Sequence, residues 1–105
     1  MLVSQTTQRR DVIEKYSTDE EIEFWNKYAR AGLTHYEQRA IQQLIHGGTR
    51  VLDIGCGCGR ATIALAQMDA RVCALDIAPR MTQVTKANVL ACDIQARAVC
   101  ADICE

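Results

Sequence analysis

Residues 51–61, VLDIGCGCGRA, decide the fold of this chain. An apolar stretch with one aspartate runs from 51 to 54, a glycine-rich turn follows, and a helical segment begins at Arg60. A strand that enters a helix through a tight glycine turn brings bare backbone amides close to a ligand at the positive end of the helix. The stretch therefore predicts a βα unit with a ligand site at its turn.

The residues after this unit repeat the same alternation of strand and helix. Short runs rich in Val, Leu and Ile predict strands at 50–54, 71–77 and 96–103, and helical stretches predict helices at 60–68 and 79–91. This is the pattern of βαβ units, so we expect an α/β, Rossmann-like parallel sheet. Because strands of nearly continuous apolar character are buried on both faces, we expect helices above and below the sheet.

The first half of the chain reads as helical. An amphipathic segment covers about 8–16, and two capping-box patterns follow, Thr18 with Glu21 and Thr34 with Glu37. In each pair the threonine accepts from the third amide of the helix and the glutamate reaches back to the cap. We expect an N-terminal helical segment over residues 1–48, followed by a partial Rossmann-like domain over residues 49–105.

Composition and charge exclude several classes of partner. The chain has 105 residues, of which 49% are hydrophobic, and a formal net charge of -1. Mixed charges without a basic stripe do not favour nucleic acid as a partner. The sequence holds no apolar run of about 18 residues for a membrane span and no secretory signal run, so a cytoplasmic location is expected.

The six cysteines all follow residue 55. Cys56 and Cys58 are one residue apart, which is shorter than structural zinc spacing, and both histidines precede every cysteine. We interpret the cysteines as reduced, compact apolar side chains, and expect no metal site. A metal or redox role is the less favoured alternative.

Three aspartates stand at the ends of the predicted strands. Asp53 precedes the glycine turn, Asp76 closes the next strand about 20 residues further on, and Asp102 lies at the end of the third. The carboxyl ends of parallel strands meet at one edge of a sheet, where ligands of such folds bind. A dinucleotide fingerprint starting at Gly55 would need glycine where Arg60 stands, which disfavours an oxidoreductase half.

The pattern D-x-G-x-G-x-G over residues 53–59 resembles motif I of class I S-adenosylmethionine-dependent methyltransferases, and the likeness extends over residues 50–105. It implies S-adenosylmethionine as the small-molecule cofactor. Asp53 and the glycine loop would hold its amino-acid end, Asp76 the ribose hydroxyls, and Ile77, Asp102 and Ile103 the adenine. The cofactor-binding residues implied in this way are Asp53, Gly55, Cys56, Gly57, Gly59, Asp76, Ile77, Asp102 and Ile103.

Members of this family build a seven-stranded sheet, whereas only three strands are recognisable here. The resemblance therefore implies the cofactor-binding portion of an enzyme, with no catalytic residue and no methyl acceptor identifiable. Strand 50–54 would be left with an open edge, which a second copy or a complementing fragment would cover. The alternative function is thus a catalytically silent binding or assembly module. Tyr16, Trp25 and Tyr28 are candidate lids over the cofactor, although core packing explains them more simply.

Overall fold

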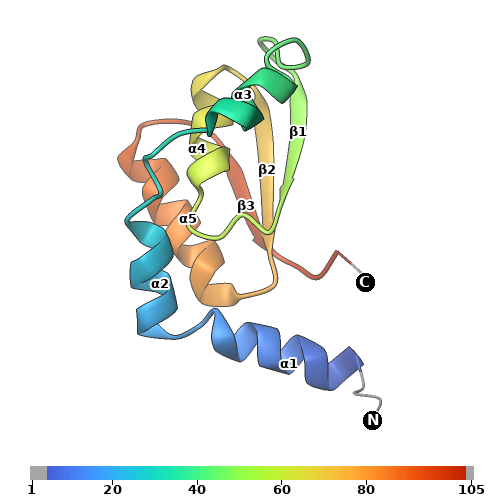
Figure 1. Cartoon of the computed structure of the whole chain (residues 1–105), viewed down its shortest axis with the longest axis vertical. Helices are drawn as coiled ribbons and strands as arrows, with labels where there is room; N and C mark the ends of the chain where they lie inside the picture. Colours follow the sequence, from blue (N-terminus) through green and yellow to red (C-terminus); the bar gives the residue numbers. More distant parts are fainter. Residues whose placement is uncertain (1–4, 104–105) are drawn as a thin grey trace.

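The computed structural model describes residues 5–103, which form five helices and one sheet of three parallel strands (Figure 1). The strand order is β1-β2-β3, so the predicted parallel, Rossmann-like sheet is confirmed. The elements in chain order are α1 (Gln5–Lys15), α2 (Asp19–Asn26), α3 (His35–Ile41), β1 (Arg50–Ile54), α4 (Arg60–Gln67), β2 (Arg71–Asp76), α5 (Pro79–Ala91) and β3 (Arg97–Cys100).

Local signals set the ends of the central elements, so the prediction matches them closely. The first strand ends at Ile54 because Gly55 follows with a φ of 72°, a conformation that favours glycine. Helix α5 begins at Pro79, whose missing N–H costs nothing in a first turn. Ala78 caps α5 without a side-chain hydrogen bond.

The third strand is shorter than the sequence suggested. We expected residues 96–103, and the structure forms a strand only over Arg97–Cys100. Its one neighbour in the sheet is β2, which ends at Asp76, the register partner of Cys100. Beyond this point only the Ala101 amide still donates to β2, to the carbonyl of Asp76 at 3.0 Å, and Asp102 and Ile103 lie in the segment that follows β3.

The expectation of helices on both faces of the sheet is wrong for the described residues. Val51 and Val72 are register partners and pack with Leu65 of α4, while α5 packs against β2 and β3 on the same side. The order β1-β2-β3 adds each strand in the same direction, and two right-handed crossovers in one direction place both helices on one face. A reversal of strand order would be needed to cover the other face.

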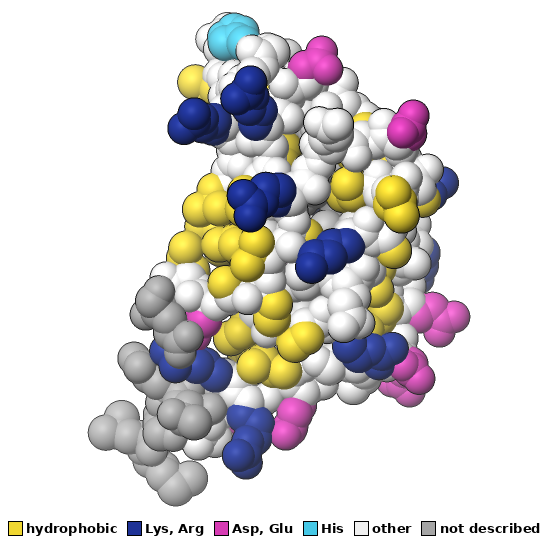
Figure 2. Space-filling model, turned by 180° about the vertical axis from the view of Figure 1, so that it is seen from behind, with side chains coloured by type: hydrophobic (Ala, Val, Ile, Leu, Met, Phe, Trp, Pro, Cys, Tyr) yellow, Lys and Arg dark blue, Asp and Glu magenta, His cyan; other side chains and the backbone are white. Residues whose placement is uncertain are grey.

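The second face of the sheet is therefore bare within residues 5–103. The alternation of side chains places Leu52 and Ile54 on it, and these two side chains are 52% and 55% exposed. Figure 2 shows hydrophobic side chains gathered on this side of the molecule, with Lys and Arg side chains beside them. The sheet residues of this face are Arg50, Leu52, Ile54, Arg71, Cys73, Leu75, Arg97 and Val99.

Both predicted caps begin helices, although only one capping box is complete. Thr34 accepts from the amide of Glu37 at 3.2 Å, and the Glu37 carboxylate accepts from the amide of Thr34 at 2.8 Å. Thr18 likewise accepts from the amide of Glu21 at 3.2 Å. The Glu21 carboxylate does not reach back, because it accepts from the Trp25 indole at 3.0 Å instead.

The N-terminal helices bury little of themselves and differ in position: the end of α3 packs near the amino ends of β1 and β2, whereas α1 and α2 lie toward the carboxyl ends of the strands (Figure 1). Helix α1 lies beyond these strand ends, and α2 runs beside α5 (Figure 1). Among residues 7–48, Ala29 alone is buried, at 3% exposure. No helix of the described residues combines the length and apolar character that a membrane crossing requires.

Candidate functional site

The glycine loop between β1 and α4 is fixed by its own backbone. Gly55, Gly57 and Gly59 have φ values of 72°, 57° and 96°, which disfavour any side chain. The amides of Gly55 and Cys56 both donate to the carbonyl of Leu75, at 2.8 and 2.9 Å, and the amide of Gly59 donates to that of Cys56 at 2.9 Å. These bonds hold the loop against the end of β2.

Asp76 joins this loop to the start of α5. One carboxylate oxygen accepts from the amide of Gly57 and the other from the amide of Ala78, each at 2.9 Å. An ionised carboxylate has about four lone-pair sites, so two remain for further donors. Asp76 therefore has a fixed orientation and can still accept a pair of hydroxyl groups.

The other two aspartates are held by side chains. The Asp53 carboxylate accepts from the Thr62 hydroxyl of α4 at 2.6 Å. The Asp102 carboxylate pairs with Nε of Arg9 in α1 at 2.6 Å, and its side chain is 14% exposed. The aspartates predicted at the three strand ends are thus anchored by three different parts of the chain.

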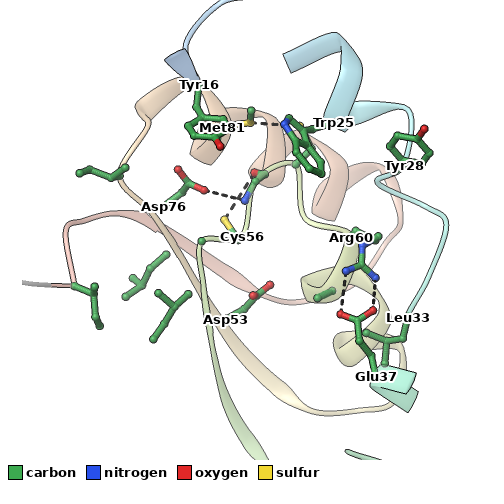
Figure 3. Close-up of a pocket in the computed structure, with 18 of the residues that line it drawn as sticks. Tyr16, Trp25, Tyr28, Leu33, Glu37, Asp53, Cys56, Arg60, Asp76 and Met81 are labelled. Atoms are coloured by element: carbon green, nitrogen blue, oxygen red, sulfur yellow. Dashed lines mark hydrogen bonds and ion pairs between the residues drawn. The ribbon is translucent and has the colours of Figure 1, made fainter. Parts of the chain in front are cut away.

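One cavity of about 970 Å³ brings most of the predicted site together. Figure 3 shows Asp53, Cys56 and Asp76 around it. Gly59 is not in its lining: a Cβ there would stand 3.2 Å from Cγ2 of Thr85, so Gly59 serves the close approach of α4 to α5. The predicted residues that do line the cavity are Asp53, Gly55, Cys56, Gly57, Asp76, Ile77, Asp102 and Ile103.

Aromatic residues in and directly after the N-terminal helices form the opposite wall. Tyr16, Trp25 and Tyr28 all line the cavity (Figure 3). Trp25 and Tyr28 are each 44% exposed, so core packing is the wrong interpretation for these two. Tyr16 has two roles, because it lines the cavity and also packs against the buried cluster that contains Met81.

An ion pair that the sequence analysis missed lies on the same cavity. The Arg60 guanidinium binds both oxygens of Glu37, at 2.7 and 3.0 Å, and also donates to the carbonyl of Gly32 at 2.8 Å. The hydrogen bond from Arg60 lowers the pKa of Glu37 to about 2, and the same bond raises the pKa of Arg60. The available signals were a capping-box glutamate and an arginine directly after the glycine loop, but nothing in the sequence connects them.

The charges around the cavity suit a cationic ligand. Its lining within the described residues holds four carboxylates, those of Glu37, Asp53, Asp76 and Asp102, and a single basic side chain, that of Arg60. An excess of negative charge in a concave site raises the local concentration of cations. A multiply charged anion such as a pyrophosphate would be repelled.

The two loop cysteines are buried thiols. Cys56 lies 3.5 Å from the Thr85 hydroxyl and Cys58 lies 3.6 Å from the Met81 sulfur. Burial raises the pKa of both thiols to about 11, which keeps them protonated and unreactive near neutral pH. In the part of the chain that the structure describes, no group of three or more His, Cys, Asp or Glu side chains is placed to hold a metal ion.

Comparison with known proteins assigns the family. Residues 51–105 match the model of the methyltransferase domain family, and this chain belongs to that family. A ubiquinone biosynthesis O-methyltransferase of Xanthomonas campestris pv. campestris (strain B100) is 42% identical over 48 residues. That match spans 46% of this chain and 20% of the relative, so the chain corresponds to a small part of the curated protein.

Solved structures agree with the fold. A TehB-like SAM-dependent methyltransferase from Corynebacterium glutamicum superposes with a TM-score of 0.62 and 29% identity, over 80% of this chain and 44% of that one. The magnesium protoporphyrin IX methyltransferase from Synechocystis PCC 6803 with bound SAH gives a TM-score of 0.64 at 21% identity, over 90% of this chain and 51% of that one. This chain thus spans about half the length of these solved relatives.

Proposed function

We propose that this chain is the cofactor-binding portion of an S-adenosylmethionine-dependent methyltransferase and binds this cofactor in the 970 Å³ cavity. The observation that carries the proposal is the convergence of Asp53, Asp76 and Asp102 with the glycine loop around one space. The family match and the named relatives, which are methyltransferases, support it.

The residues present fit such a ligand. A Cβ built on Gly55 or Gly57 meets nothing within 4 Å, so the loop leaves open space where a ligand can approach the backbone. The amides of Gly55, Cys56, Gly57 and Gly59 all donate within the chain. They are therefore not arranged to bind a pyrophosphate, whereas a sulfonium ligand needs no such donors.

Each strand end would have its own role in binding. Asp76 would accept the two ribose hydroxyls with its remaining lone pairs, and Ile77 would pack on the adenine. Asp102 would accept from the adenine amino group while the amide of Ile103 donates to the ring. Asp53 and the glycine loop would hold the ammonium end.

The bound cofactor would supply a methyl group on a sulfonium, which is open to in-line attack by a nucleophile. The contribution of this chain would be orientation, since its side chains fix one wall of the reaction space. No residue is assigned as a general base. The curated relatives are named for ubiquinone biosynthesis, but the methyl acceptor of this chain stays open.

Isothermal titration calorimetry tests the proposal. The chain should bind S-adenosylhomocysteine and show no heat with NAD. Replacing Asp76 by Ala should weaken S-adenosylhomocysteine binding by about 10- to 100-fold, because a hydrogen-bonded carboxylate is lost. Asp11→Ala removes an exposed aspartate outside the cavity and serves as the matched control. Equal affinity for NAD, or binding unchanged by Asp76→Ala, would refute the assignment.

A second candidate function is a catalytically silent assembly module, favoured by the open edge of β1. Among the described strands β1 has a neighbour on one side only, and an unpaired edge is a template for another strand. Leu52 and Ile54 are more than half exposed on the bare face beside this edge. A second copy or a complementing fragment would then pair with β1. Sedimentation velocity should show a concentration-dependent dimer that Leu52→Lys abolishes, and a monomer at all concentrations would exclude self-association.

The division of the chain also remains part of this proposal. Residues 1–48 would form a cap over the cofactor and residues 49–105 the partial cofactor-binding domain. The low burial of α1 to α3 supports the cap, and so do Tyr16, Trp25 and Tyr28, which line the cavity. A cytoplasmic location stays a prediction from the sequence.

A further inference from the structure

The Arg60 side chain connects three separate segments of the chain. Arg60 is the first residue of α4, directly after the glycine loop. Its guanidinium reaches the carbonyl of Gly32, in the turn after α2, and both carboxylate oxygens of Glu37 in α3, at distances of 2.7 to 3.0 Å. A bidentate contact of this kind fixes orientation as well as distance.

Glu37 is prepared for this contact by its own helix. Its carboxylate also accepts from the amide of Thr34 at 2.8 Å, and its amide donates to the Thr34 hydroxyl at 3.2 Å. The capping box therefore fixes the Glu37 side chain before Arg60 is added. The pair is a built feature of the start of α3 rather than a chance meeting of two long side chains.

The start of α3 has little else to hold it. Helix α3 contains no buried residue, and the apolar contacts of this region come from Leu33 and Ile41, which are only partly buried against the Leu65 cluster. The Arg60 side chain is 34% exposed and that of Glu37 is 38% exposed. The polar contacts of Arg60 are thus the main tie between residues 32–37 and the glycine loop.

These same residues form one end of the cavity. Leu33, Thr34 and Glu37 line it, and Arg60 lines it from the loop side. Figure 3 shows Arg60 and Glu37 on the side away from Asp76 and Tyr16. If Asp76 holds the ribose, the Arg60 end is where the amino-acid part of the cofactor would lie.

We propose that Arg60 is a positioning residue that holds the wall formed by residues 32–37 against the glycine loop, and so shapes the amino-acid end of the cofactor cavity. This inference rests on the proposed function. Arg60 acts through Glu37 and Gly32 and does not itself contact the ligand. Replacing Arg60 should therefore lower the affinity for ligands with an amino-acid end and leave the affinity for ligands without one nearly unchanged.

Two ligands and three variants of the full 105-residue chain test the inference. The ligands are S-adenosylhomocysteine and 5′-methylthioadenosine, which has the same adenosyl group but no amino-acid end. Arg60→Gln should weaken binding of the first about tenfold and of the second less than about twofold. Glu37→Gln keeps an oxygen for the Thr34 amide but removes the bidentate ion pair, and it should weaken S-adenosylhomocysteine binding in the same selective way. Arg39→Gln removes an exposed arginine of α3 and should change neither.

Hydrogen exchange of the ligand-free chain gives an independent readout. Arg60→Gln should speed exchange of amides in residues 32–41 about tenfold relative to the wild type, and Arg39→Gln should not. Unchanged exchange, equal losses for the two ligands, or no loss for either would overturn the positioning role. Unchanged affinity of Glu37→Gln would overturn it too, because direct ligand contact by Arg60 would then explain the loss. If the wild type binds neither ligand, the proposed function fails, and the inference about the amino-acid end fails with it.

Discussion

Arg9 and Asp102 form an ion pair in which Nε lies 2.6 Å from the carboxylate oxygen. The pair joins α1 to the segment after β3, and Val12 of the same helix and Tyr16, directly after it, line the cavity. Asp102 is the side chain proposed to accept from the adenine amino group. A carboxylate has about four lone-pair sites, so Arg9 would orient Asp102 while this carboxylate still accepts from the ligand.

This arrangement predicts the effect of removing Arg9. Arg9→Gln should weaken S-adenosylhomocysteine binding about threefold to fivefold, because Asp102 loses a partly exposed ion pair of ~1 kcal/mol that fixes its orientation. Added salt should narrow the difference from the wild type. Arg10→Gln, at an exposed neighbouring position, is the calorimetric control. Tighter binding by Arg9→Gln would mean that Arg9 competes with the ligand for the Asp102 carboxylate.

Gly59 predicts a stability effect separate from binding. Gly59→Ala and Gly48→Ala both place a Cβ on a residue with φ of 96° and 84°, which costs about 1 to 2 kcal/mol. At Gly59 the new Cβ also stands 3.2 Å from Thr85, whereas at Gly48 it meets nothing within 4 Å. Urea unfolding should show a loss of about 1 kcal/mol more for Gly59→Ala. Equal losses would show that Thr85 moves aside freely.

The Glu37 carboxyl predicts a dependence of stability on pH. Arg60 lowers the pKa of Glu37 from 4.5 to about 2, so the stabilisation is present above pH 4.5 and is lost as the pH falls from there to about 2. Glu37→Gln should lower the free energy of unfolding by about 1 kcal/mol at pH 7, a modest value because more than a third of the side chain is exposed. Urea titrations should show that the difference in unfolding free energy between the wild type and Glu37→Gln decreases below pH 4.5. The same difference in unfolding free energy at pH 7 and pH 3 would contradict the assignment of this pH dependence to Glu37.

The cysteines should differ in reactivity with iodoacetamide. Burial raises the pKa of Cys56 and Cys58 from 9.0 to about 11, which reduces the thiolate about a hundredfold at pH 7.5. Among the cysteines that the structure describes, Cys100 is the exposed one and should be labelled first. Mass spectrometry of peptides after timed labelling checks the order, with urea-unfolded chain as the reference. Early labelling of Cys56 would show that the glycine loop opens readily.

The sequence could predict the elements whose limits depend on nearby residues. The bounds of β1 match the expected range 50–54, and α4 and β2 each end one residue before the end of their own expected ranges. The agreement is close because Gly55, Gly59 and Pro79 act on their own neighbours. The length of β3 depended on where β2 ends, and the bare sheet face on the shared direction of two crossovers. Neither property is visible in a local pattern.

The candidate site divides in the same way. The aspartates and glycines were found because strand ends and turns have local signatures. The contacts of Arg9 with Asp102 and of Arg60 with Glu37 join residues far apart in the chain. Trp25 and Tyr28 had a helical spacing that suits a core, and only the position of α2 beside the cavity places them on its wall.

The bare sheet face also governs how this chain responds to temperature. Leu52 and Ile54 are already more than half exposed in the native state. Unfolding therefore exposes less additional apolar surface to water than it would for a sheet covered on both sides. The heat-capacity increment of unfolding should then fall below the usual value of about 12–15 cal/mol/K per residue. The curve of stability against temperature is correspondingly shallow, and cooling weakens this chain less than a protein of equal length with a fully enclosed sheet.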